Sequence, residues 1–239
     1  PDREQQKPAQ PRWRQAREER SEPNVKILAI SDVPSKALWD YNTREHLEGI
    51  DLILSCGDLP KRYLEYLTNF TAVPILYVHG NHDGSYLNNE PGGCTCVDDQ
   101  VFVWKGLRIM GLGGCIRYNR EDTFQYTEWE MRRRARKLWL QAHKQGGIDL
   151  LLTHAPASGL NDGTDRAHKG FQCFNDLLDE YQPRWFVHGH MHLNYDAKLP
   201  RICTRGSTTV INATERYVFE IPDPDPNEPR KFLWGTAKR

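Results

Sequence analysis

Short apolar segments alternate with longer polar ones along this chain of 239 residues. The runs at 25–30, 51–56 and 73–78 are rich in aliphatic and β-branched residues and are too short for typical helices. Two further runs, at 149–153 and 184–188, have the same character. Nearly continuous apolar character over such lengths is typical of strands that are covered on both faces. The pattern therefore predicts five buried strands as the frame of the fold.

The segments between these strands carry apolar residues at helical spacing. Helices are expected at 36–48, 61–70, 127–144 and 171–181. In the third of these, Met131, Ala135, Leu138 and Ala142 share one face. Arginine and lysine side chains between positions 132 and 137 occupy much of the remaining surface, and such a run is usually a solvated helix face rather than a nucleic-acid patch. Strands interleaved with helices predict an α/β fold with a largely parallel sheet.

Other β segments lie outside this alternation. The segments 101–104 and 107–112 are separated only by Lys105 and Gly106, a spacing typical of a hairpin. A long loop is expected at 84–100, which is rich in Gly, Asn and Pro. Further short strands are expected near Ile202, at 210–211 and at 217–221.

The two ends of the chain differ from its middle. Residues 1–24 are rich in Arg, Glu, Gln and Pro and predict a polar N-terminal tail. Residues 222–239 begin with repeated prolines, which exclude a helix or a central strand and predict an extended C-terminal arm. Because no change of composition divides residues 25–221, we expect one domain there.

Composition narrows the class of protein. Charged residues make up 27% and hydrophobic residues 38% of the chain, as in soluble globular proteins. A formal net charge of zero gives no long-range attraction to nucleic acid or to anionic membranes. No apolar run approaches the ~20 residues of a membrane span. The six cysteines include no Cys-x-x-Cys pair, so we expect reduced thiols in a cytoplasmic protein. No membrane partner is expected either. Nucleic acid is not favoured as a partner, and the oligomeric state stays open.

Each predicted strand ends in side chains that can bind a metal ion. The carboxyl ends of parallel strands meet at one edge of a sheet, and sites form there in open α/β proteins. His190 and His192 can both face such a site, because residues i and i+2 of an extended segment point the same way. Oxygen and imidazole donors without thiolate suit Mn²⁺, Fe or Zn²⁺. The side chains expected to meet are Asp32, Asp58, Asn81, His82, Asp83, His154, His190 and His192.

Together these strand ends resemble the motif series of the calcineurin-like metallophosphoesterase superfamily, which is Asp-x-His, Gly-Asp, Gly-Asn-His-Asp/Glu, His and Gly-His-x-His. The resemblance extends over roughly residues 25–213. It implies an α/β fold, a single-domain four-layer α/β/β/α sandwich of the metallophosphoesterase type, with two divalent metal ions at the strand ends. An enzyme of this class would hydrolyse a phosphodiester or a small phosphomonoester through a metal-bridging hydroxide.

The resemblance also implies a ligand set. Manganese is the expected ion, with iron and zinc as alternatives. One position departs from the family pattern, because Pro34 stands two residues after Asp32 where the family has a histidine. Proline offers no ligand atom, so the first ion is expected to bind more weakly. Asp58 would bridge both ions, Asp32 and His192 would complete the first, and Asn81, His154 and His190 would hold the second.

The same resemblance implies catalytic roles for His82, beside the scissile phosphate, and for Asp83, which would orient His82. Three residues are candidates for substrate binding. His168 precedes a predicted helix, whose N-terminus favours an anion. Arg62 follows the Gly-Asp motif, and Arg117 follows a glycine-rich turn.

Two other classes of function stay open. Pro34 motivates a binding or scaffold protein with a degenerate metallophosphoesterase site. The arginine run that begins at Arg132 motivates a nuclease. The sequence does not separate cyclic nucleotides, nucleotide esters, phosphoproteins and RNA ends as substrates.

Overall fold

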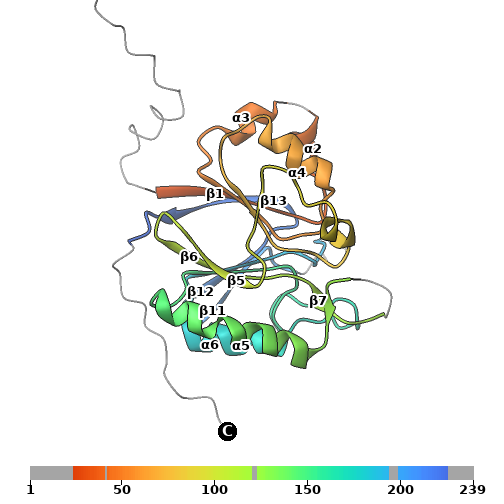
Figure 1. The fold of residues 1–239 in the computed structure, drawn as a ribbon, viewed down its shortest axis with the longest axis vertical. Coiled ribbons are helices and arrows are strands. Elements are labelled where there is room, and N and C mark those ends of the chain that lie inside the picture. Colours follow the sequence, from red (N-terminus) through yellow and green to blue (C-terminus); the bar gives the residue numbers. More distant parts are fainter. Residues whose placement is uncertain (1–23, 41, 120–122, 194–198, 226–239) are drawn as a thin grey trace, which may run out of the picture.

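The computed structural model describes residues 24–40, 42–119, 123–193 and 199–225. Within these residues two sheets lie at the centre, and helices flank them on either side (Figure 1). The predicted tail at 1–24 and arm at 222–239 fall almost entirely outside the described residues.

The first sheet contains the first three predicted strands. Its order is β13-β1-β2-β3-β4, with β1, β2, β3 and β4 parallel and β13 antiparallel to β1. The strands are β1 (Asn24–Ser31), β2 (Leu52–Ser55), β3 (Ile75–Tyr77), β4 (Thr95–Cys96) and β13 (Glu215–Pro222). Helices α2 (Lys36–Trp39), α3 (Thr43–Leu47) and α4 (Lys61–Thr68) cover its outer face through a cluster that includes Leu28, Ile53, Tyr63 and Leu67.

The second sheet contains the other two predicted strands and the predicted hairpin. Its order is β11-β12-β10-β9-β6-β5. The four inner strands are parallel and the two edge strands are antiparallel to their neighbours. The strands are β5 (Gln100–Trp104), β6 (Leu107–Leu112), β9 (Leu150–Thr153), β10 (Trp185–His188), β11 (Ile202–Arg205) and β12 (Thr208–Asn212). Helices α5 (Glu128–Lys144) and α6 (Gln172–Tyr181) pack on its outer face.

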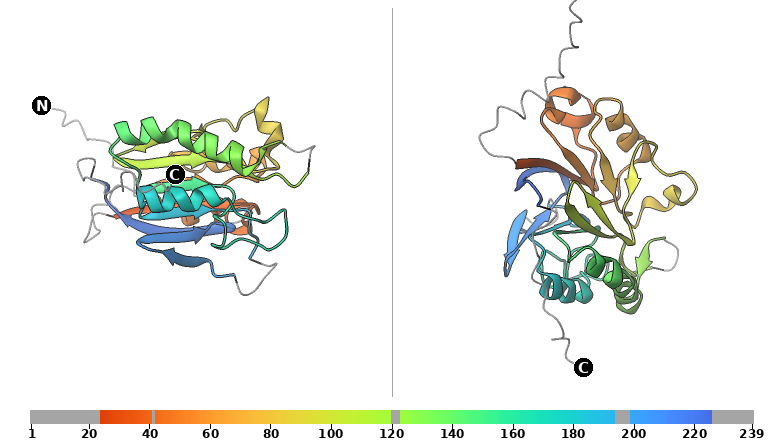
Figure 2. Two further views of the ribbon diagram at one scale, coloured as in Figure 1. Left: turned by 90° about the horizontal axis from the view of Figure 1, so that it is seen from below. Right: turned by 60° about the vertical axis from the view of Figure 1, so that its left-hand side comes forward.

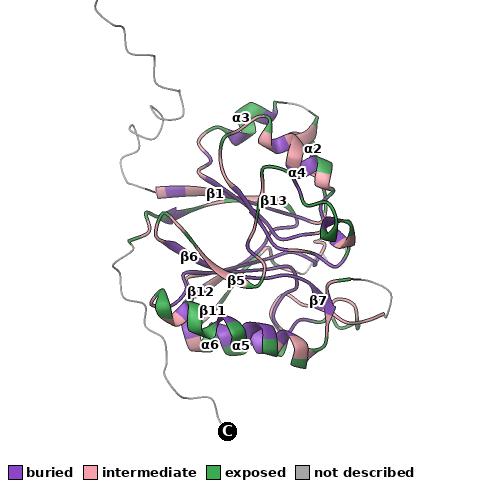
Figure 3. Ribbon diagram, in the orientation of Figure 1, coloured by how far each residue is buried: buried purple, intermediate pink, exposed green. Residues whose placement is uncertain are grey.

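The inner faces of the two sheets pack against each other, as the two views in Figure 2 show. Side chains from both sheets, among them Ile27, Leu54, Leu152 and Val187, are almost fully buried between them. Figure 3 shows the strands mostly buried and parts of α5 exposed. The predicted α/β class is therefore confirmed. Three smaller elements complete the fold, namely η1 (Asp83–Leu87), β7 (Cys115–Ile116) and β8 (Gln125–Tyr126).

The structure corrects three expectations about local structure. The helix predicted at 36–48 is two short helices, because Asn42 adopts a left-handed φ of 55° between them. The loop predicted at 84–100 contains most of η1 and all of β4. The five strand ends do not belong to one sheet, since β1, β2 and β3 lie in the first and β9 and β10 in the second.

Helix α5 begins as its sequence suggests, but its basic run is only partly solvated. Thr127 and Glu130 form a reciprocal capping box at its N-terminus. Met131, Ala135, Leu138 and Ala142 are buried as predicted. Arg134 is buried as well, because it lies on the same face of the helix as these apolar residues.

Candidate metal centre

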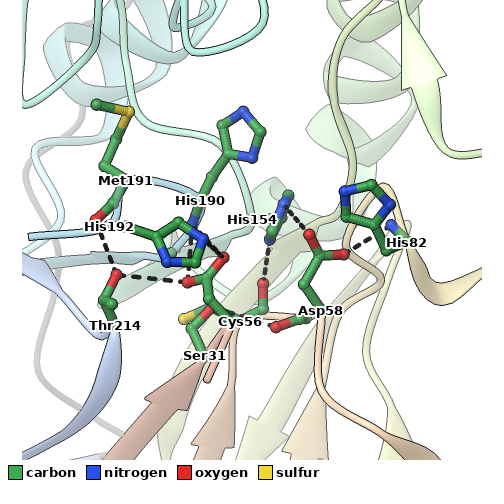
Figure 4. Close-up of polar contacts among 12 residues, drawn as sticks. Ser31, Cys56, Asp58, His82, His154, His190, Met191, His192 and Thr214 are labelled. Atoms are coloured by element: carbon green, nitrogen blue, oxygen red, sulfur yellow. Dashed lines mark hydrogen bonds and ion pairs between the residues drawn. The ribbon is translucent and has the colours of Figure 1, made fainter. Parts of the chain in front are cut away.

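The ends of strands from both sheets meet at one site. Asp32, Asp58 and Asn81 follow β1, β2 and β3 of the first sheet, and His154 and His190 follow β9 and β10 of the second. Figure 4 shows Asp58, His154 and His190 beside one another. The packing of the two sheets brings these side chains together from positions far apart in the chain.

Two glycines allow the loops after β2 and β3 to touch. Gly57 has a φ of 91°, and a Cβ atom there would lie 2.2 Å from the backbone nitrogen of Gly80. A Cβ atom on Gly80 would lie 2.0 Å from Oδ1 of Asp58. Real Cβ atoms do not approach other atoms this closely. The glycines of the Gly-Asp and Gly-Asn motifs are therefore needed for the close contact of the two loops.

His154 occupies the centre of the site and has no solvent exposure. Its Nδ1 atom lies 2.7 Å from the carbonyl oxygen of Cys56, to which it donates. Its Nε2 atom lies 3.0 Å from Oδ1 of Asn81 and 3.4 Å from Oδ2 of Asp58. With the Nδ1 proton donated to Cys56, a neutral ring presents its Nε2 lone pair to two oxygen acceptors. Three electron-pair donors facing one another require a proton or a cation between them.

The electrostatics of this group agree with that requirement. Burial alone would lower the pKa of His154, but the charge and hydrogen bond of Asp58, with a further contribution from Asp32, raise it to about 9. Burial alone would raise the pKa of Asp58, but His154 and the backbone N–H of His82 lower it to about 2. The site therefore keeps an ionised carboxylate and attracts positive charge to the Nε2 position.

His190 adds a second imidazole. One ligand atom from each of Asp58, His154 and His190 lies within 4.8 Å of the others. The Nε2 atom of His190 donates to the carbonyl oxygen of Ala167 at 2.8 Å, which leaves the lone pair of the neutral ring on Nδ1. Burial lowers the pKa of His190 to about 3 and so favours the neutral ring. A carboxylate, an amide oxygen and two imidazoles form a donor set that fits a divalent cation.

Asp32 and His192 lie beside this group. Both carboxylate oxygens of Asp32 accept from the backbone N–H of His190, each at 3.0 Å. The Nε2 atom of His192 lies 4.0 Å from Oδ1 of Asp32, and the hydroxyl of Thr214 lies 3.4 Å from its Oδ2. Burial raises the pKa of Asp32, an effect that His154 partly opposes. Asp32 thus holds the backbone of one predicted ligand and faces the side chain of another.

The two predicted catalytic residues are arranged differently from each other. His82 is exposed, and its backbone N–H donates to Oδ1 of Asp58 at 2.7 Å. Asp83 is buried, and its Oδ2 accepts from the backbone N–H groups of Gly80, at 2.7 Å, and of Asp58, at 2.9 Å. Burial raises the pKa of Asp83 to about 6. The carboxylate of Asp83 thus ties the two glycine turns together, and its expected role in orienting the ring of His82 stays a prediction.

The three predicted substrate-binding residues lie in different surroundings. The ring of His168 lies 5.3 Å from that of His190, centroid to centroid, and its Nδ1 lies 2.9 Å from Asp165. Arg117 pairs with Glu130 at 2.9 Å. Arg62 is exposed and lines a pocket together with residues of the loops that follow β1 and β2. Of the three, only His168 has a ring contact with a histidine of the metal centre, His190, and the roles of all three stay predictions.

Sequence reasoning missed several residues that support the site. Tyr118 accepts a hydrogen bond from Nδ2 of Asn81 at 3.3 Å, and nothing in the sequence distinguishes this tyrosine. His79 lies 2.9 Å from Asp98, and its ring stacks on Phe124 with centroids 4.2 Å apart. Asp98 in turn pairs with Arg134. Arg134 could have been found, because its helical position places it on the buried face of α5.

With the fold and the site described, comparisons identify the class of protein. The family model of the calcineurin-like phosphoesterases matches residues 25–194, so the chain belongs to this family. Among solved structures, a sulfate thiohydrolase, SoxB, from Termus thermophilus in complex with glycerol is similar at 15% identity and a TM-score of 0.39. The match covers 79% of this chain and 42% of that one, so the chain spans less than half of its neighbour's length. No curated protein sequence matches this chain.

Family membership indicates the general class of chemistry. The family binds divalent metals, and the group of Asp58, His154 and His190 is a candidate site for one. Membership supports a metal-dependent phosphoesterase, and hence a hydrolase. Among the described helices, none combines the length and the apolar character needed to cross a membrane.

Proposed function

We propose that this protein hydrolyses a phosphodiester or a small phosphomonoester with the help of two divalent metal ions. One observation carries the proposal, namely the convergence of Oδ2 of Asp58 and Oδ1 of Asn81 on the buried Nε2 of His154. Such a group favours a cation at its centre. We propose manganese, because oxygen and imidazole donors without thiolate suit it, with iron and zinc as alternatives.

The ions would lower the pKa of a water molecule and stabilise the charge that develops on the phosphoryl oxygens. The side chains of the protein would hold and orient the reacting groups. His82, which is exposed beside Asp58, would donate a proton to the leaving oxygen. Asp83 would fix the two turns that carry Asp58 and Asn81. Asp58 would bridge the ions, Asp32 and His192 would complete the first, and Asn81, His154 and His190 the second.

A second candidate is a binding or scaffold protein with an incomplete site. Pro34 favours it, because this residue offers no ligand atom beside Asp32. This candidate predicts at most one ion per chain and no hydrolysis with any metal. A nuclease gains less support, since two arginines of the basic run, Arg132 and Arg134, are paired with carboxylates.

The proposed partner is a small phosphoester, and neither a membrane nor a long nucleic acid is proposed. The six cysteines are all free thiols, as in proteins of reducing compartments, which supports the proposed cytoplasmic location.

The test combines metal analysis with a panel of phosphomonoesters and phosphodiesters in Mn²⁺. We expect Asp58→Asn and His82→Ala to abolish hydrolysis of a nitrophenyl phosphate ester while the circular dichroism spectrum is unchanged. Asp179→Asn is the matched control, because it removes an exposed carboxylate that pairs only with Arg205 among the described residues. Unchanged turnover in both site variants would rule out the proposed function.

A further inference from the structure

A pocket of about 220 Å³ lies where the loops that follow β1 and β2 meet. We call it the ring pocket, and its lining residues are Pro34, Lys36, Trp39, Asp40, Pro60 and Arg62. Pro34 follows Asp32 by two residues, and Pro60 follows Asp58 by two residues. The two loops that carry these carboxylates of the metal centre therefore also form the ring pocket.

The walls of the ring pocket are largely apolar and rigid. Pro34 and Pro60 have no backbone N–H to offer a ligand, and their rings fix the local backbone. Trp39 is held by two tyrosines, with ring centroids 5.1 Å from Tyr63 and 5.2 Å from Tyr66. Tyr63 is itself fully buried. Because Trp39 is fixed before any ligand binds, little conformational entropy is lost when a planar ring packs against it.

The rim of the ring pocket is positively charged. Lys36 and Arg62 contribute two cations against the single carboxylate of Asp40. Within the part of the chain that the structure describes, neither Lys36 nor Arg62 forms an ion pair. A net positive rim beside an apolar wall is complementary to a ligand that joins an anionic group to an apolar one.

The size of the ring pocket limits what it can hold. Pockets for drug-sized ligands are usually about 300–1,000 Å³, so this one is small. It suits one ring system better than a polymer or a long acyl chain.

We propose that the ring pocket binds the organic group of the substrate, and that this group is a planar aromatic ring esterified to the phosphate. The inference rests on the proposed function, since the phosphate itself would lie at the metal centre. The proposal also assigns a role to Pro34. This residue lacks the ligand atom of the histidine that the family has at its position, and its ring forms an apolar wall for the substrate.

The experiment measures kcat/KM for phenyl phosphate and for ethyl phosphate in the Mn²⁺-loaded protein. The ratio of the two values is the ring preference, and comparing it between variants cancels the intrinsic reactivity of each ester. Trp39→Leu is expected to lower the ring preference roughly tenfold, which is the usual size of the effect when an aromatic side chain that stacks on a ligand ring is removed. The ring preference of Trp39→Phe, which keeps a smaller ring, should lie between those of the natural protein and of Trp39→Leu. This variant replaces Trp39→Leu in the test if Trp39→Leu does not fold. The matched control is Trp129→Leu, which removes a tryptophan that is 66% exposed on α5 and should leave the preference unchanged.

A second measurement does not depend on turnover. Nitrophenyl phosphate added to metal-free protein should quench part of the tryptophan fluorescence, because its nitro-substituted ring quenches an excited indole that it contacts. The quenching should persist in Trp129→Leu and disappear in Trp39→Leu, because Trp39 is the ring that the ligand contacts.

The outcomes separate the two proposals. If Trp39→Leu and the natural protein hydrolyse both esters with the same ring preference, the proposal that the ring pocket binds the substrate is overturned. The proposed phosphoesterase function is not affected by that result. Absence of hydrolysis of these monoesters and of every phosphodiester in the panel would contradict the proposed function. Fluorescence would then decide, since quenching that requires Trp39 supports the ring pocket and absence of quenching overturns it.

Discussion

The Nη2 atom of Arg134 lies 2.8 Å from Oδ1 of Asp98, in a pair whose side chains are 10% and 8% exposed. This pair links helix α5 to the turn that carries the metal centre. Asp98 also binds the ring of His79, which directly precedes Gly80 and Asn81. Arg134 further donates to the carbonyl oxygen of Gly113 at 2.7 Å. A basic residue of a helix that the sequence predicts to be solvated thus contacts, through Asp98, the turn that carries part of the site.

Replacing Arg134 by glutamine should destabilise the protein by about 3–5 kcal/mol, because the carboxylate of Asp98 would stay buried without its charged partner. Denaturant unfolding monitored by circular dichroism measures this change. Arg136→Gln is the control, since Arg136 is exposed on the same helix and its loss should cost less than about 0.5 kcal/mol. Equal effects of the two substitutions would show that the pair with Asp98 does not stabilise the fold.

The charge of Asp98 should make the stability depend on pH. Burial alone would raise the pKa of Asp98, but the hydrogen bond from His79 and the charge of Arg134 lower it below its ordinary value of 3.8. A lowered pKa means that the ionised form stabilises the fold above about pH 4, and that this contribution is lost as the pH falls through the folded-state value. The unfolding free energies of the natural protein and of Asp98→Asn should therefore differ at pH 7 and converge in acid. A difference that stays constant between pH 7 and pH 3 would contradict this account.

Gly80→Ala should remove both metal binding and activity. The added Cβ atom would lie 2.0 Å from Oδ1 of Asp58, so the carboxylate or the turn must move. Elemental analysis and ester hydrolysis should both show the loss. Gly92→Ala is the matched control, because its Cβ atom would meet only the flexible carboxylate of Glu65, at 3.2 Å. Normal metal content in Gly80→Ala would show that the site tolerates a wider turn.

Pro34→His should strengthen binding of the first ion, because it restores a nitrogen donor two residues after Asp32. Calorimetric titration with Mn²⁺ should show tighter binding of that ion. The same substitution replaces an apolar wall of the ring pocket, so the ring preference should fall. Unchanged metal binding would show that position 34 does not reach the site.

Much of this architecture could be predicted from the sequence, because the five strands are apolar runs that end in polar motifs. The end of each run marks the edge of a sheet, so residues such as Asp58 and His154 could be expected to lie near each other. The division into two sheets could not be derived from these runs, since strand length and polarity do not state which strands pair. That feature came from the resemblance to a family.

Other details depended on contacts that no periodicity encodes. The break at Asn42 depends on a single left-handed residue. The two backbone N–H groups that donate to the carboxylate of Asp83 come from different loops, and their positions depend on how closely these loops approach each other. The pairing of Arg117 with Glu130 depends on the start of α5. Such contacts become visible only when the tertiary structure is known.

Strand β1, which leads to Asp32, pairs along all eight of its residues with β13. The hydroxyl that contacts Asp32 from Thr214 lies just before β13 as well. During synthesis β1 can pair early with β2, but its antiparallel partner β13 is made almost two hundred residues after β1. Loading of the site with metal should accordingly be a late event, completed after translation of β13 and not while the polypeptide is still growing.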